Sequence, residues 1–430
     1  MNNLQSCNII WCVLMMLLAV SVSGCGASKD SSKTEINKVS KSAVLKMKDG
    51  DLKETLIIEP SIYPPGGLDV KKVPLFVVFG DDDNGYSGLD AQGNIIKNAA
   101  GTAWLVDMFS GINNPAGRGN SKTFDGSQVH FSLMGLSEYV TWENRVECKK
   151  AWRMAYEQGH EIGNHTATHP HGTNASVEDW KREILTCNSD ISKPWDPDNL
   201  ESLETGIGVP ALDIIGFRSP YLQYNDDLFT VLEQNNFKYD CSIEEGYENN
   251  FNGRDLYWPY TLHNGTPANP AIKKHPSIIE LPVYPFVVPP DDKCNEYGVK
   301  QGLRSALAAR ESGKQFQKDH AHDYVHLDDG RIRGLDYDLW QEYNMTAAEF
   351  LATLKYTLDE RLSGNRAPMT ICMHTDFYVK NPWDEPCGIE NHIARQHALK
   401  DFFDYAHSKR DVRIVSGKEL VEWLQNPVEL

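Results

Sequence analysis

The chain has 430 residues, with 60 acidic and 42 basic side chains that give a formal net charge of −18 at pH 7. Because such a surface repels phosphate backbones, this balance excludes a nucleic-acid partner. Hydrophobic residues make up 40% of the chain, which is enough for a core, and the length allows one large domain or two smaller ones. An uncharged sugar polymer is compatible with this composition.

The first residues predict export. Residues 8–22 form an apolar run that is too short for a membrane-spanning helix, and Val22-Ser23-Gly24-Cys25 looks like the lipobox of a bacterial lipoprotein. We therefore expect a lipoprotein signal peptide over 1–24, a polar flexible tether over 25–45, and a membrane anchor through lipid on Cys25. An ordinary cleaved signal peptide with an incidental cysteine is the alternative.

Six cysteines follow Cys25, and an exported chain allows disulfides. They are Cys148, Cys187, Cys241, Cys294, Cys372 and Cys387. Cys241 and Cys372 lie in apolar, strand-like runs and are expected to be free core thiols. The expected bridges are Cys148–Cys187 and Cys294–Cys387.

The folded core begins with a continuous apolar run over 74–79, which predicts a strand buried on both faces. Further strands are expected at 129–133, 214–217, 239–243, 278–284, 369–373 and 412–415. Helices are expected at 142–158, from Ser176 to Cys187, at 226–235, at 346–362, at 391–408, and from Ser416 to before Pro427. Ser176, Thr346 and Ser416 are predicted N-caps, the last two within capping boxes.

Alternation of strands and helices predicts a parallel α/β architecture, which an open doubly wound sheet or a closed barrel would satisfy. We assign one domain to 46–430, with its core over about 73–426. The segment 287–344 is polar and rich in Asp, His and Gly. We expect it to be an insertion of loops over one end of the domain.

Three adjacent carboxylates follow the first predicted strand: Asp81, Asp82 and Asp83, before Asn84. Because adjacent carboxylates repel one another, this run favours a bound cation or a nearby arginine. A solvated acidic loop or a calcium loop is the alternative.

His165 and His169 stand four residues apart, so one helical turn would place both imidazoles on the same face. Neutral imidazole is the commonest protein ligand for transition metals. Thr166 excludes a zincin site, which needs Glu directly after the first histidine. His160 and His171 are expected at the surface, and the triplet His320, His322 and His326 is expected to be solvated or an adventitious metal binder.

Two further motifs follow strand-like runs. Arg218-Ser219-Pro220-Tyr221 follows the strand at 214–217, and His374 follows the strand at 369–373. Taken alone, these are typical of a surface turn and of a core histidine. The active site of a parallel barrel lies at the carboxyl ends of its strands, however, where these residues and the Asp and His motifs would meet.

Together these motifs resemble the polysaccharide deacetylases (carbohydrate esterase family 4, the NodB homology fold). His165-Thr-Ala-Thr-His169 matches the family's His-Ser/Thr-x-x-His motif, and Arg218–Tyr221 matches Arg-x-Pro-Tyr. The acidic run departs from Thr-Phe-Asp-Asp-Gly, and Met373-His374 matches Leu-x-His loosely. The resemblance covers roughly Leu75 to Leu424. It implies a distorted (β/α) barrel with fewer than eight strands and long loop insertions.

The resemblance also implies residue roles. Asp83, His165 and His169 would bind one divalent metal ion, most simply Zn²⁺, with Co²⁺ or Ni²⁺ as substitutes. Asp82 would be the general base and His374 the general acid.

By the same resemblance, Arg218 would orient the base, and the backbone N–H of Tyr221 would stabilise the oxyanion. The third Asp leaves the register open, because Asp81 as base with Asp82 as ligand also fits. In the preferred register Asn84 takes the glycine's place, since Asn tolerates a left-handed conformation.

The family's Asp/Trp pocket motif has two candidates, Asp336–Trp340 and Glu280–Tyr284. Asp376 is a further candidate for orienting His374.

These expectations describe a metal-dependent hydrolase that removes acetyl groups from N-acetylated polysaccharide, such as chitin, peptidoglycan or a related glycan. The alternatives are an O-acetyl (acetylxylan-type) carbohydrate esterase and a non-catalytic glycan-binding surface lipoprotein. The expected location is the bacterial cell envelope, with the lipid anchor in the outer membrane if the host is Gram-negative. The catalytic domain would then lie in the periplasm or outside the cell.

Overall fold

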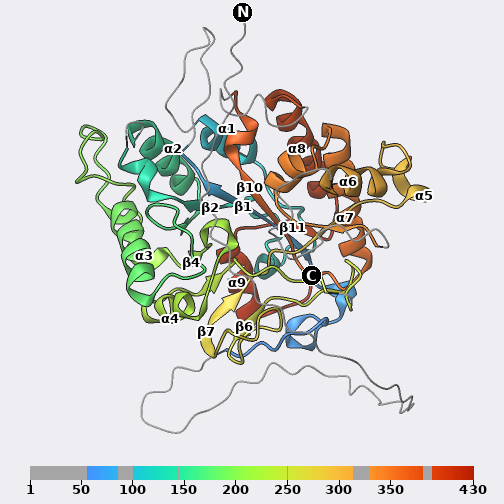
Figure 1. Ribbon diagram of the computed structural model, residues 1–430, viewed down its shortest axis with the longest axis horizontal. Coiled ribbons are helices and arrows are strands. Elements are labelled where there is room, and N and C mark those ends of the chain that lie inside the picture. The colour runs from blue at the N-terminus through green and yellow to red at the C-terminus, as the bar shows by residue number, and fades with distance from the viewer. Residues whose placement is uncertain (1–55, 86–99, 143–144, 249, 313–328, 381–389) are drawn as a thin grey trace, which may run out of the picture. The chain divides into compact units, whose positions relative to one another are not determined.

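The computed structural model describes residues 56–430, with gaps at 86–99, 143–144, 249, 313–328 and 381–389 (Figure 1). The predicted signal peptide, the tether and the three histidines of the 320–326 triplet lie outside the described residues. Those that are described all fall within one unit, Ser40–Leu430. Within these ranges, no helix combines the length and the apolar character that crossing a membrane requires.

A mostly parallel sheet forms the centre of the fold. In chain order its nine strands among the described residues are β1 Leu75–Asp83, β2 Ser132–Gly135, β3 Glu161–Asn164, β4 Gly216–Phe217, β5 Tyr239–Asp240, β6 Tyr260–Leu262, β7 His275–Glu280, β10 Met369–His374 and β11 Val412–Ile414. The pairing order is β10-β1-β2-β3-β4-β5-β7-β6, and only β6 is antiparallel to its neighbour. Strands from β1 to β5 therefore follow one another in space as in sequence, as βα repeats predict.

The two edges of β1 explain how nine strands fill eight positions. Val77 pairs with both β10 and β11, so these two strands lie on opposite edges of β1. Gly80 pairs with both β10 and β2, so β2 lies on the same edge as β11. The strands in seven of the eight positions run parallel to one another, whereas a regular (β/α) barrel has eight parallel strands. The predicted distorted barrel is confirmed, with fewer than eight parallel strand positions.

The other edge of β10 meets the segment that follows β7. The Thr370 hydroxyl donates a 2.9 Å hydrogen bond to the carbonyl of Pro282, and Cys372 forms a parallel bridge with Leu335. These single contacts bring the two ends of the sheet together, so the carboxyl ends of the strands surround a common mouth.

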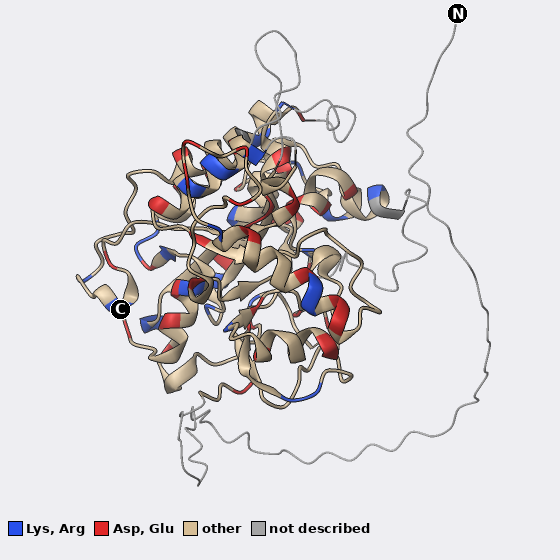
Figure 2. Cartoon of the chain, turned by 90° about the vertical axis from the view of Figure 1, so that its left-hand side faces the viewer, with Lys and Arg blue, Asp and Glu red and all other residues tan. Residues whose placement is uncertain are grey.

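Helices surround the sheet (Figure 1). They are α1 Ala100–Phe109, α2 Arg145–Glu157, α3 Val177–Ser192, α4 Asp226–Gln234, α5 Asp291–Cys294, α6 Leu303–Ser312, α7 Ala347–Ser363, α8 His392–His407 and α9 Gly417–Gln425. The predicted N-caps Ser176, Thr346 and Ser416 are confirmed, and each forms a capping box. Figure 2 shows Lys, Arg, Asp and Glu distributed along these helices and their connecting loops.

The amino ends of the strands are covered by α9. The backbone N–H of Gly417 donates to the hydroxyl of Ser132 at 2.8 Å, and the N–H of Lys418 donates to the carboxylate of Glu161 at 2.8 Å. Ser132 and Glu161 are the first residues of β2 and β3. Because this end is closed by packing, the opposite end is the one that can hold a site.

The segment 287–344 contains more regular structure than the expected loops. Its described residues include α5, α6, and a small antiparallel ladder in which β9 (Arg331–Ile332) pairs with β8 (Phe286–Val287). A π-helical turn follows at Asp338–Glu342. The ladder holds the chain beside β10, so this segment supplies a side chain to the mouth.

Two expectations about buried residues are wrong. Cys148 and Cys187 are free thiols that lie apart in the core, and their sulfurs contact the carbonyls of Gly85 and Gly135 instead of each other. His160 was expected at the surface but is buried. Its ring stacks on Phe131, with 4.0 Å between ring centroids.

The predicted free thiols Cys241 and Cys372 are confirmed as buried and unpaired. Cys294 is also a free thiol in this structure, whereas its expected partner Cys387 lies outside the described residues.

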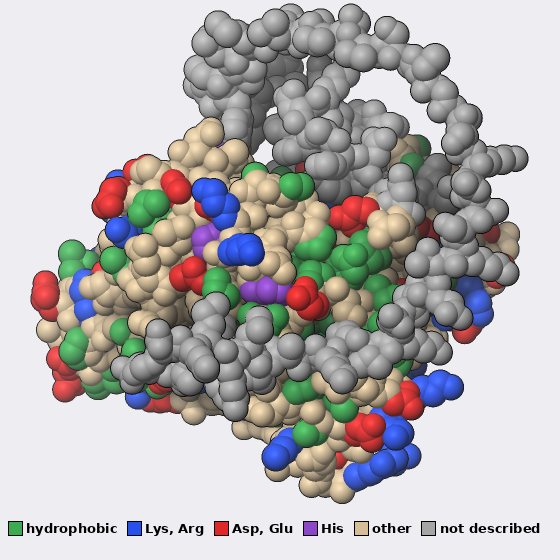
Figure 3. Space-filling model, turned by 90° about the horizontal axis from the view of Figure 1, so that it is seen from below, with side chains coloured by type: hydrophobic (Ala, Val, Ile, Leu, Met, Phe, Trp, Pro, Cys, Tyr) green, Lys and Arg blue, Asp and Glu red, His purple; other side chains and the backbone are tan. Residues whose placement is uncertain are grey.

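Figure 3 shows a face on which acidic and basic side chains are interspersed. Such charges often lie in pairs: the ammonium of Lys273, for example, is 2.9 Å from the carboxylate of Asp226. The net negative charge of the chain is therefore combined with local charge pairing.

Candidate metal and catalytic site

The polar residues predicted from the sequence meet at the carboxyl ends of four strands. The acidic run ends β1, His165 directly follows β3, Arg218 follows β4, and His374 is the last residue of β10. Asp82 and His374 are paired residues in the ladder between β1 and β10. The barrel topology thus brings together motifs that lie almost 300 residues apart in the chain.

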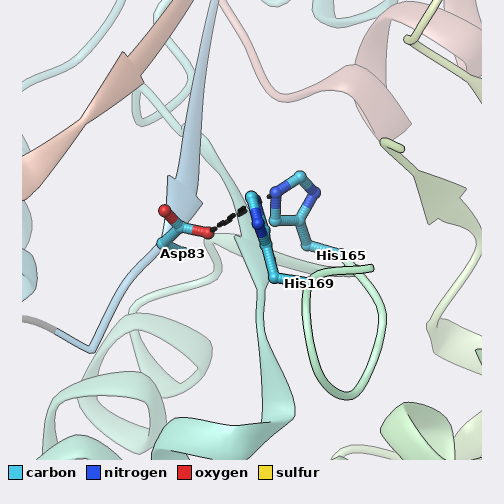
Figure 4. A group of neighbouring side chains, drawn as sticks. All are labelled: Asp83, His165 and His169. Atoms are coloured by element: carbon cyan, nitrogen blue, oxygen red, sulfur yellow. Dashed lines mark ion pairs between the residues drawn. The ribbon is translucent and has the colours of Figure 1, made fainter. Parts of the chain in front are cut away.

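Asp83, His165 and His169 converge on one point (Figure 4). The Oδ1 atom of Asp83 lies 3.5 Å from the Nε2 atom of each histidine, and the three potential ligand atoms all lie within 4.8 Å of one another. Oδ1 of Asp83 is buried and has no hydrogen-bond partner among the described residues. One carboxylate oxygen and two imidazole nitrogens are the donor set of a catalytic zinc site.

The protonation of the histidines suits a metal. The Nδ1 atom of His165 is 2.8 Å from the carbonyl oxygen of Arg218, so Nδ1 carries the proton and the Nε2 lone pair faces Asp83. Burial lowers the pKa of His165, and burial with the nearby charge of His374 lowers the pKa of His169 to about 4. Both imidazoles are therefore neutral near pH 7, as metal ligation requires.

The two histidines do not share a helical turn, so that expectation is wrong. Residues 165–169 form an irregular bend in which Thr166 and His169 have positive φ angles of 72° and 57°. The side chain of Asn164 accepts the N–H of Thr166, and Glu183 accepts both the N–H and the hydroxyl of Thr168. Side-chain hydrogen bonds rather than helix geometry therefore hold the two imidazoles together.

Asp82 is held by Arg218. The Nη1 atom of Arg218 lies 2.6 Å from Oδ1 of Asp82, and both side chains are almost fully buried. The guanidinium also donates through Nε to the carbonyl of Cys241. A Cβ atom at Gly80 would lie 2.7 Å from Nη2 of Arg218, so glycine is needed where the guanidinium crosses β1. This ion pair keeps a carboxylate beside the three potential metal ligands, which we call the ligand trio.

Asp81 has a different environment. One of its carboxyl oxygens accepts the backbone N–H of Thr375 at 3.0 Å, and the other is buried without a partner among the described residues. Burial and the neighbouring Asp82 charge raise the pKa of Asp81 well above its usual range. Burial thus favours the protonated form of Asp81, and a proton there relieves the repulsion within the acidic run.

Asn84 takes the left-handed conformation expected of it, with φ at 69°. Its amide nitrogen donates to the carbonyls of Asp81 and Met134. This turn fixes the direction of the chain immediately after Asp83.

His374 is held by Asp336, a residue that the sequence placed only in a candidate pocket motif. The Nδ1 atom of His374 lies 2.9 Å from Oδ1 of Asp336, and the backbone N–H of His374 donates to Oδ2. Burial acts to lower the pKa of His374, but the carboxylates of Asp336, Asp82 and Asp83 outweigh it and raise the pKa well above its usual range. Asp336, rather than Asp376, is the carboxylate bound to this imidazole.

Trp340, the other end of the candidate motif that begins at Asp336, does not lie beside His374. Trp340 is fully buried and stacks on Phe350, with 4.2 Å between ring centroids. In the other candidate motif, Glu280 and Tyr284 are buried in the barrel. Of the two candidate segments, the described contacts place only Asp336 at His374.

Tyr221 lies on the other side of the ligand trio. Its ring is half exposed, and its centroid is 4.5 Å from that of His169. Tyr221 and Leu222 have positive φ angles of 57° and 54°, directly after Pro220. A backbone held in this unusual conformation fixes the direction of its N–H groups.

Comparison with known proteins matches this part of the chain. A polysaccharide deacetylase domain profile matches residues 134–239, a range that contains His165, His169, Arg218 and Tyr221. The chain is 21% identical over 432 aligned residues to chitin deacetylase 1 of Bombyx mori, an alignment that covers 98% of this chain and 64% of that protein. It is 23% identical over 371 residues to chitin deacetylase 8 of Bombyx mori, covering 85% of this chain and 74% of that protein.

A crystal structure from Mycobacterium smegmatis, of a protein assigned to the polysaccharide deacetylases, covers 86% of this chain and 95% of that chain. Its sequence identity is 15% and its TM-score is 0.43. Among the curated relatives, chitin deacetylase 1 is the longer protein, and this chain spans less than two thirds of its length.

Proposed function

We propose that this chain is a polysaccharide deacetylase, a metal-dependent hydrolase that removes acetyl groups from N-acetylated polysaccharide. The substrate class comprises chitin, peptidoglycan and related N-acetylglucosamine glycans. The observation that carries the proposal is the meeting of three potential metal ligands with two held proton-transfer groups at one barrel mouth.

The ligand trio fits a divalent metal ion. Oδ1 of Asp83 is buried with no hydrogen-bond partner among the described residues, and the two Nε2 atoms that face it belong to neutral imidazoles. Removing an oxygen acceptor from water without a partner is costly, and a cation compensates for that cost. A divalent ion held there, most simply Zn²⁺, would make water acidic enough to act as a nucleophile near neutral pH and would polarise the acyl carbonyl.

Asp82 is the general base in this proposal. It accepts a proton from the attacking water as the water oxygen bonds to the acetamide carbon. The guanidinium of Arg218 at 2.6 Å favours the ionised carboxylate and fixes its orientation. The alternative register, with Asp81 as base, is disfavoured because Asp81 accepts the N–H of Thr375, whereas Arg218 pairs with Asp82.

The backbone N–H of Tyr221 stabilises the negative charge that develops on the acetamide oxygen. The rigid Pro220 and the left-handed backbone at Tyr221 position this donor before the substrate arrives. By analogy with other oxyanion holes, one such donor contributes about 3–4 kcal/mol to the transition state.

His374 is the general acid. Its Nδ1–H is bonded to Asp336, so Nε2 carries the proton that passes to the departing amine nitrogen. Cleavage of the C–N bond then releases acetate and leaves a free amine on the sugar. Because the pKa of His374 is raised, its imidazolium form persists to a higher pH than that of an ordinary histidine.

Metal content and acetate release, measured together, test these roles. We expect His165→Ala and Asp83→Ala to lose zinc and activity together. Asp82→Asn should keep its zinc but lose about 100- to 10,000-fold in kcat, the range for a proton-transfer group. Asp81→Asn is the matched control, and we expect it to retain most activity. The register is wrong if Asp81→Asn abolishes acetate release while Asp82→Asn preserves it.

Substrate choice is tested with parallel N-acetyl and O-acetyl substrates. Acetate release from chitin oligomers and peptidoglycan, but not from acetylated xylan, is the expected result. Preferential release from acetylated xylan would identify an O-acetyl esterase. A zinc-loaded protein that binds these glycans without releasing acetate from any of them would be a non-catalytic glycan-binding protein.

We also propose that lipid on Cys25 anchors the chain in a bacterial cell envelope, with the catalytic domain outside the cytoplasm. The support is the lipobox-like Val22–Cys25 run after the apolar segment 8–22. Mass spectrometry of the mature N-terminus should find a diacylated Cys25. The Cys25→Ser variant should move from the membrane to the soluble fraction, and an unlipidated mature N-terminus in the unmodified chain would refute the anchor.

A further inference from the structure

The segment at the carboxyl end of β5 carries buried polar groups that have no part in the chemistry described above. Asp240 ends β5, and Ser242 lies two residues later. Both side chains are fully buried, at 0% exposure. Because a buried carboxylate or hydroxyl is costly unless it is hydrogen-bonded, the partners of these two groups indicate what they hold in place.

The hydroxyl of Ser242 connects Asp240 to the turn that carries Tyr221. It donates to Oδ1 of Asp240 at 2.8 Å and accepts the backbone N–H of Ser219 at 2.8 Å. A hydroxyl has one hydrogen to donate, so donation to the carboxylate leaves its lone pairs for the N–H. Ser219 is itself fully buried, so among the described residues the loss of this oxygen would leave its N–H without an acceptor.

The carboxylate of Asp240 fixes the direction of that hydroxyl. Its Oδ2 accepts the backbone N–H of Ser242 at 2.9 Å, so both of its oxygens bind the same residue. Asp240 is also hydrogen-bonded to Glu280, whose Oε1 accepts the N–H of Ile243 at 3.1 Å. Burial and the charge of Asp240 raise the pKa of Glu280 well above its usual range, which favours Glu280 as the proton donor to Asp240. These contacts hold the Ser242 hydroxyl in one orientation.

The same segment also holds Arg218. The carbonyl of Cys241 accepts Nε of Arg218 at 3.1 Å, and the N–H of Cys241 donates to the carbonyl of Phe217 at 2.9 Å. Residues 240–242 thus contact Arg218 through a backbone carbonyl and the next residue, Ser219, through a side-chain hydroxyl. Support for the proposed base and support for the proposed oxyanion donor therefore come from one short segment.

Beyond Ser219 the turn is closed by its own hydrogen bonds. The N–H of Leu222 donates to the carbonyl of Ser219 at 3.1 Å, and the N–H of Gln223 donates to the carbonyl of Pro220 at 3.0 Å. The hydroxyl of Ser219 also donates to the carbonyl of Gln223. Tyr221 lies inside this turn with its positive φ of 57°. A turn closed in this way moves as a unit, so its attachment at Ser219 sets the position of the Tyr221 N–H.

We propose that Ser242 is a positioning residue, which fixes the Tyr221 N–H through its hydrogen bond to Ser219. Asp240 orients the Ser242 hydroxyl for this bond. The inference rests on the proposed function for the role of the Tyr221 N–H as oxyanion donor. Because an oxyanion donor acts on the transition state, displacing it lowers kcat and leaves KM unchanged.

Ser132 offers a matched control at the opposite end of the barrel. Its hydroxyl also donates to a buried carboxylate, that of Glu161 at 2.7 Å, and accepts a backbone N–H, that of Gly417 at 2.8 Å. Ser242→Ala and Ser132→Ala therefore remove the same pair of hydrogen bonds, at the mouth in one variant and at the closed end in the other. We measure kcat and KM for acetate release, zinc content, unfolding in urea, and amide hydrogen exchange of the turn.

We expect Ser242→Ala to lose about 10- to 100-fold in kcat at unchanged KM and zinc content, as a displaced oxyanion donor would. Amide exchange in residues 219–223 should become at least about tenfold faster in this variant. Ser132→Ala should lose stability but keep both kcat and the exchange of the turn within about twofold of the unmodified enzyme. In Ser242→Cys the sulfur is a weaker acceptor at the same position, so its kcat should lie between those of Ser242→Ala and the unmodified enzyme.

The positioning role is overturned if Ser242→Ala keeps full kcat, if its loss appears in KM alone, or if Ser132→Ala loses as much kcat. Should Ser242→Ala fail to fold, full kcat in Ser242→Cys would overturn it. Unchanged exchange of the turn in Ser242→Ala would do so whether or not acetate is released. Faster exchange in Ser242→Ala, in a chain whose unmodified form releases acetate from no acetylated glycan, would support the attachment of the turn and refute the proposed function.

Discussion

Replacing Asp336 by Asn isolates the electrostatic contribution of one carboxylate to the proposed general acid. The substitution preserves the size of the side chain but removes the charge 2.9 Å from Nδ1 of His374. A hydrogen bond to a charged group is worth about 1.5–3 kcal/mol, and one pKa unit corresponds to about 1.4 kcal/mol. We therefore expect the pKa of His374 to fall by about 1–2 units, because burial still lowers this pKa and one of the carboxylates that raise it has been removed.

The sign of this shift predicts the change in the pH–rate profile. His374 must be protonated to act as an acid, so activity is lost as the pH rises through its pKa. In Asp336→Asn that loss should begin about 1–2 pH units lower than in the unmodified enzyme, while metal content stays the same. The assay is kcat for acetate release from pH 5 to 10, together with an NMR titration of the histidine side chains.

Asp376→Asn is the matched control, since Asp376 is the carboxylate nearest to His374 in sequence. We expect this variant to lose kcat at the same alkaline pH as the unmodified enzyme. The assignment of Asp336 is refuted if Asp336→Asn also loses kcat at that unchanged pH, or if that pH shifts only in Asp376→Asn.

Three further changes test the scaffold. In Gly80→Ala the new Cβ displaces Arg218, so we expect kcat/KM to fall by about 10- to 100-fold at unchanged zinc content, measured by acetate release and metal analysis. Arg413→Ala leaves Asp125 as a fully buried, unpaired charge, and we expect a loss of about 3–5 kcal/mol in the free energy of unfolding, measured in urea. Burial lowers the pKa of His160 to about 3, below its unfolded value near 6.5, so the stability it contributes is present above pH 6.5 and is lost as the pH falls toward 3. The unmodified protein should lose up to about 2 kcal/mol between pH 7 and pH 5 from this group, and His160→Gln should lose correspondingly less.

Much of the framework was predictable because it depends on local patterns. Ser176, Thr346 and Ser416 begin helices through contacts with residues three positions away, which a sequence displays directly. The βα alternation predicted the parallel sheet, and strand ends predicted where the polar residues meet. The motif resemblance then selected a barrel over an open sheet, which periodicity alone does not decide.

The errors come from contacts that depend on three-dimensional packing. His160 lies between Gly159 and Glu161 in sequence, yet its ring packs against Phe131 in the core. The bend at 165–169 is set by Asn164 and Glu183, the second of which belongs to a helix that begins later in the chain. A disulfide between Cys148 and Cys187 was expected because the exported chain has an even number of cysteines. Their spacing in the sequence, however, carries no information on whether the two sulfurs face each other.

Asp336 was missed as the partner of His374 for the same reason. It lies 38 residues earlier in the chain, in the segment expected to be loops, whereas Asp376 is close in sequence. The only available signal was the Asp-x-x-x-Trp pattern at Asp336–Trp340, which pointed to a pocket rather than to an imidazole. The ladder of β8 and β9 and the bridge from Leu335 to β10 bring this carboxylate to its position.

The acidic run shows why three adjacent carboxylates can serve three purposes. Along a regular strand, successive side chains alternate between faces, so Asp82 and Asp83 would point apart. The left-handed conformations of Asp83 and Asn84, with φ at 66° and 69°, interrupt that alternation at the end of β1. Asp83 then reaches the two imidazoles while Asp82 remains on Arg218 and Asp81 stays buried against the N–H of Thr375. A residue that tolerates positive φ after the last carboxylate is therefore what permits the extra Asp, and this geometry favours Asp82 and Asp83 as the functional pair.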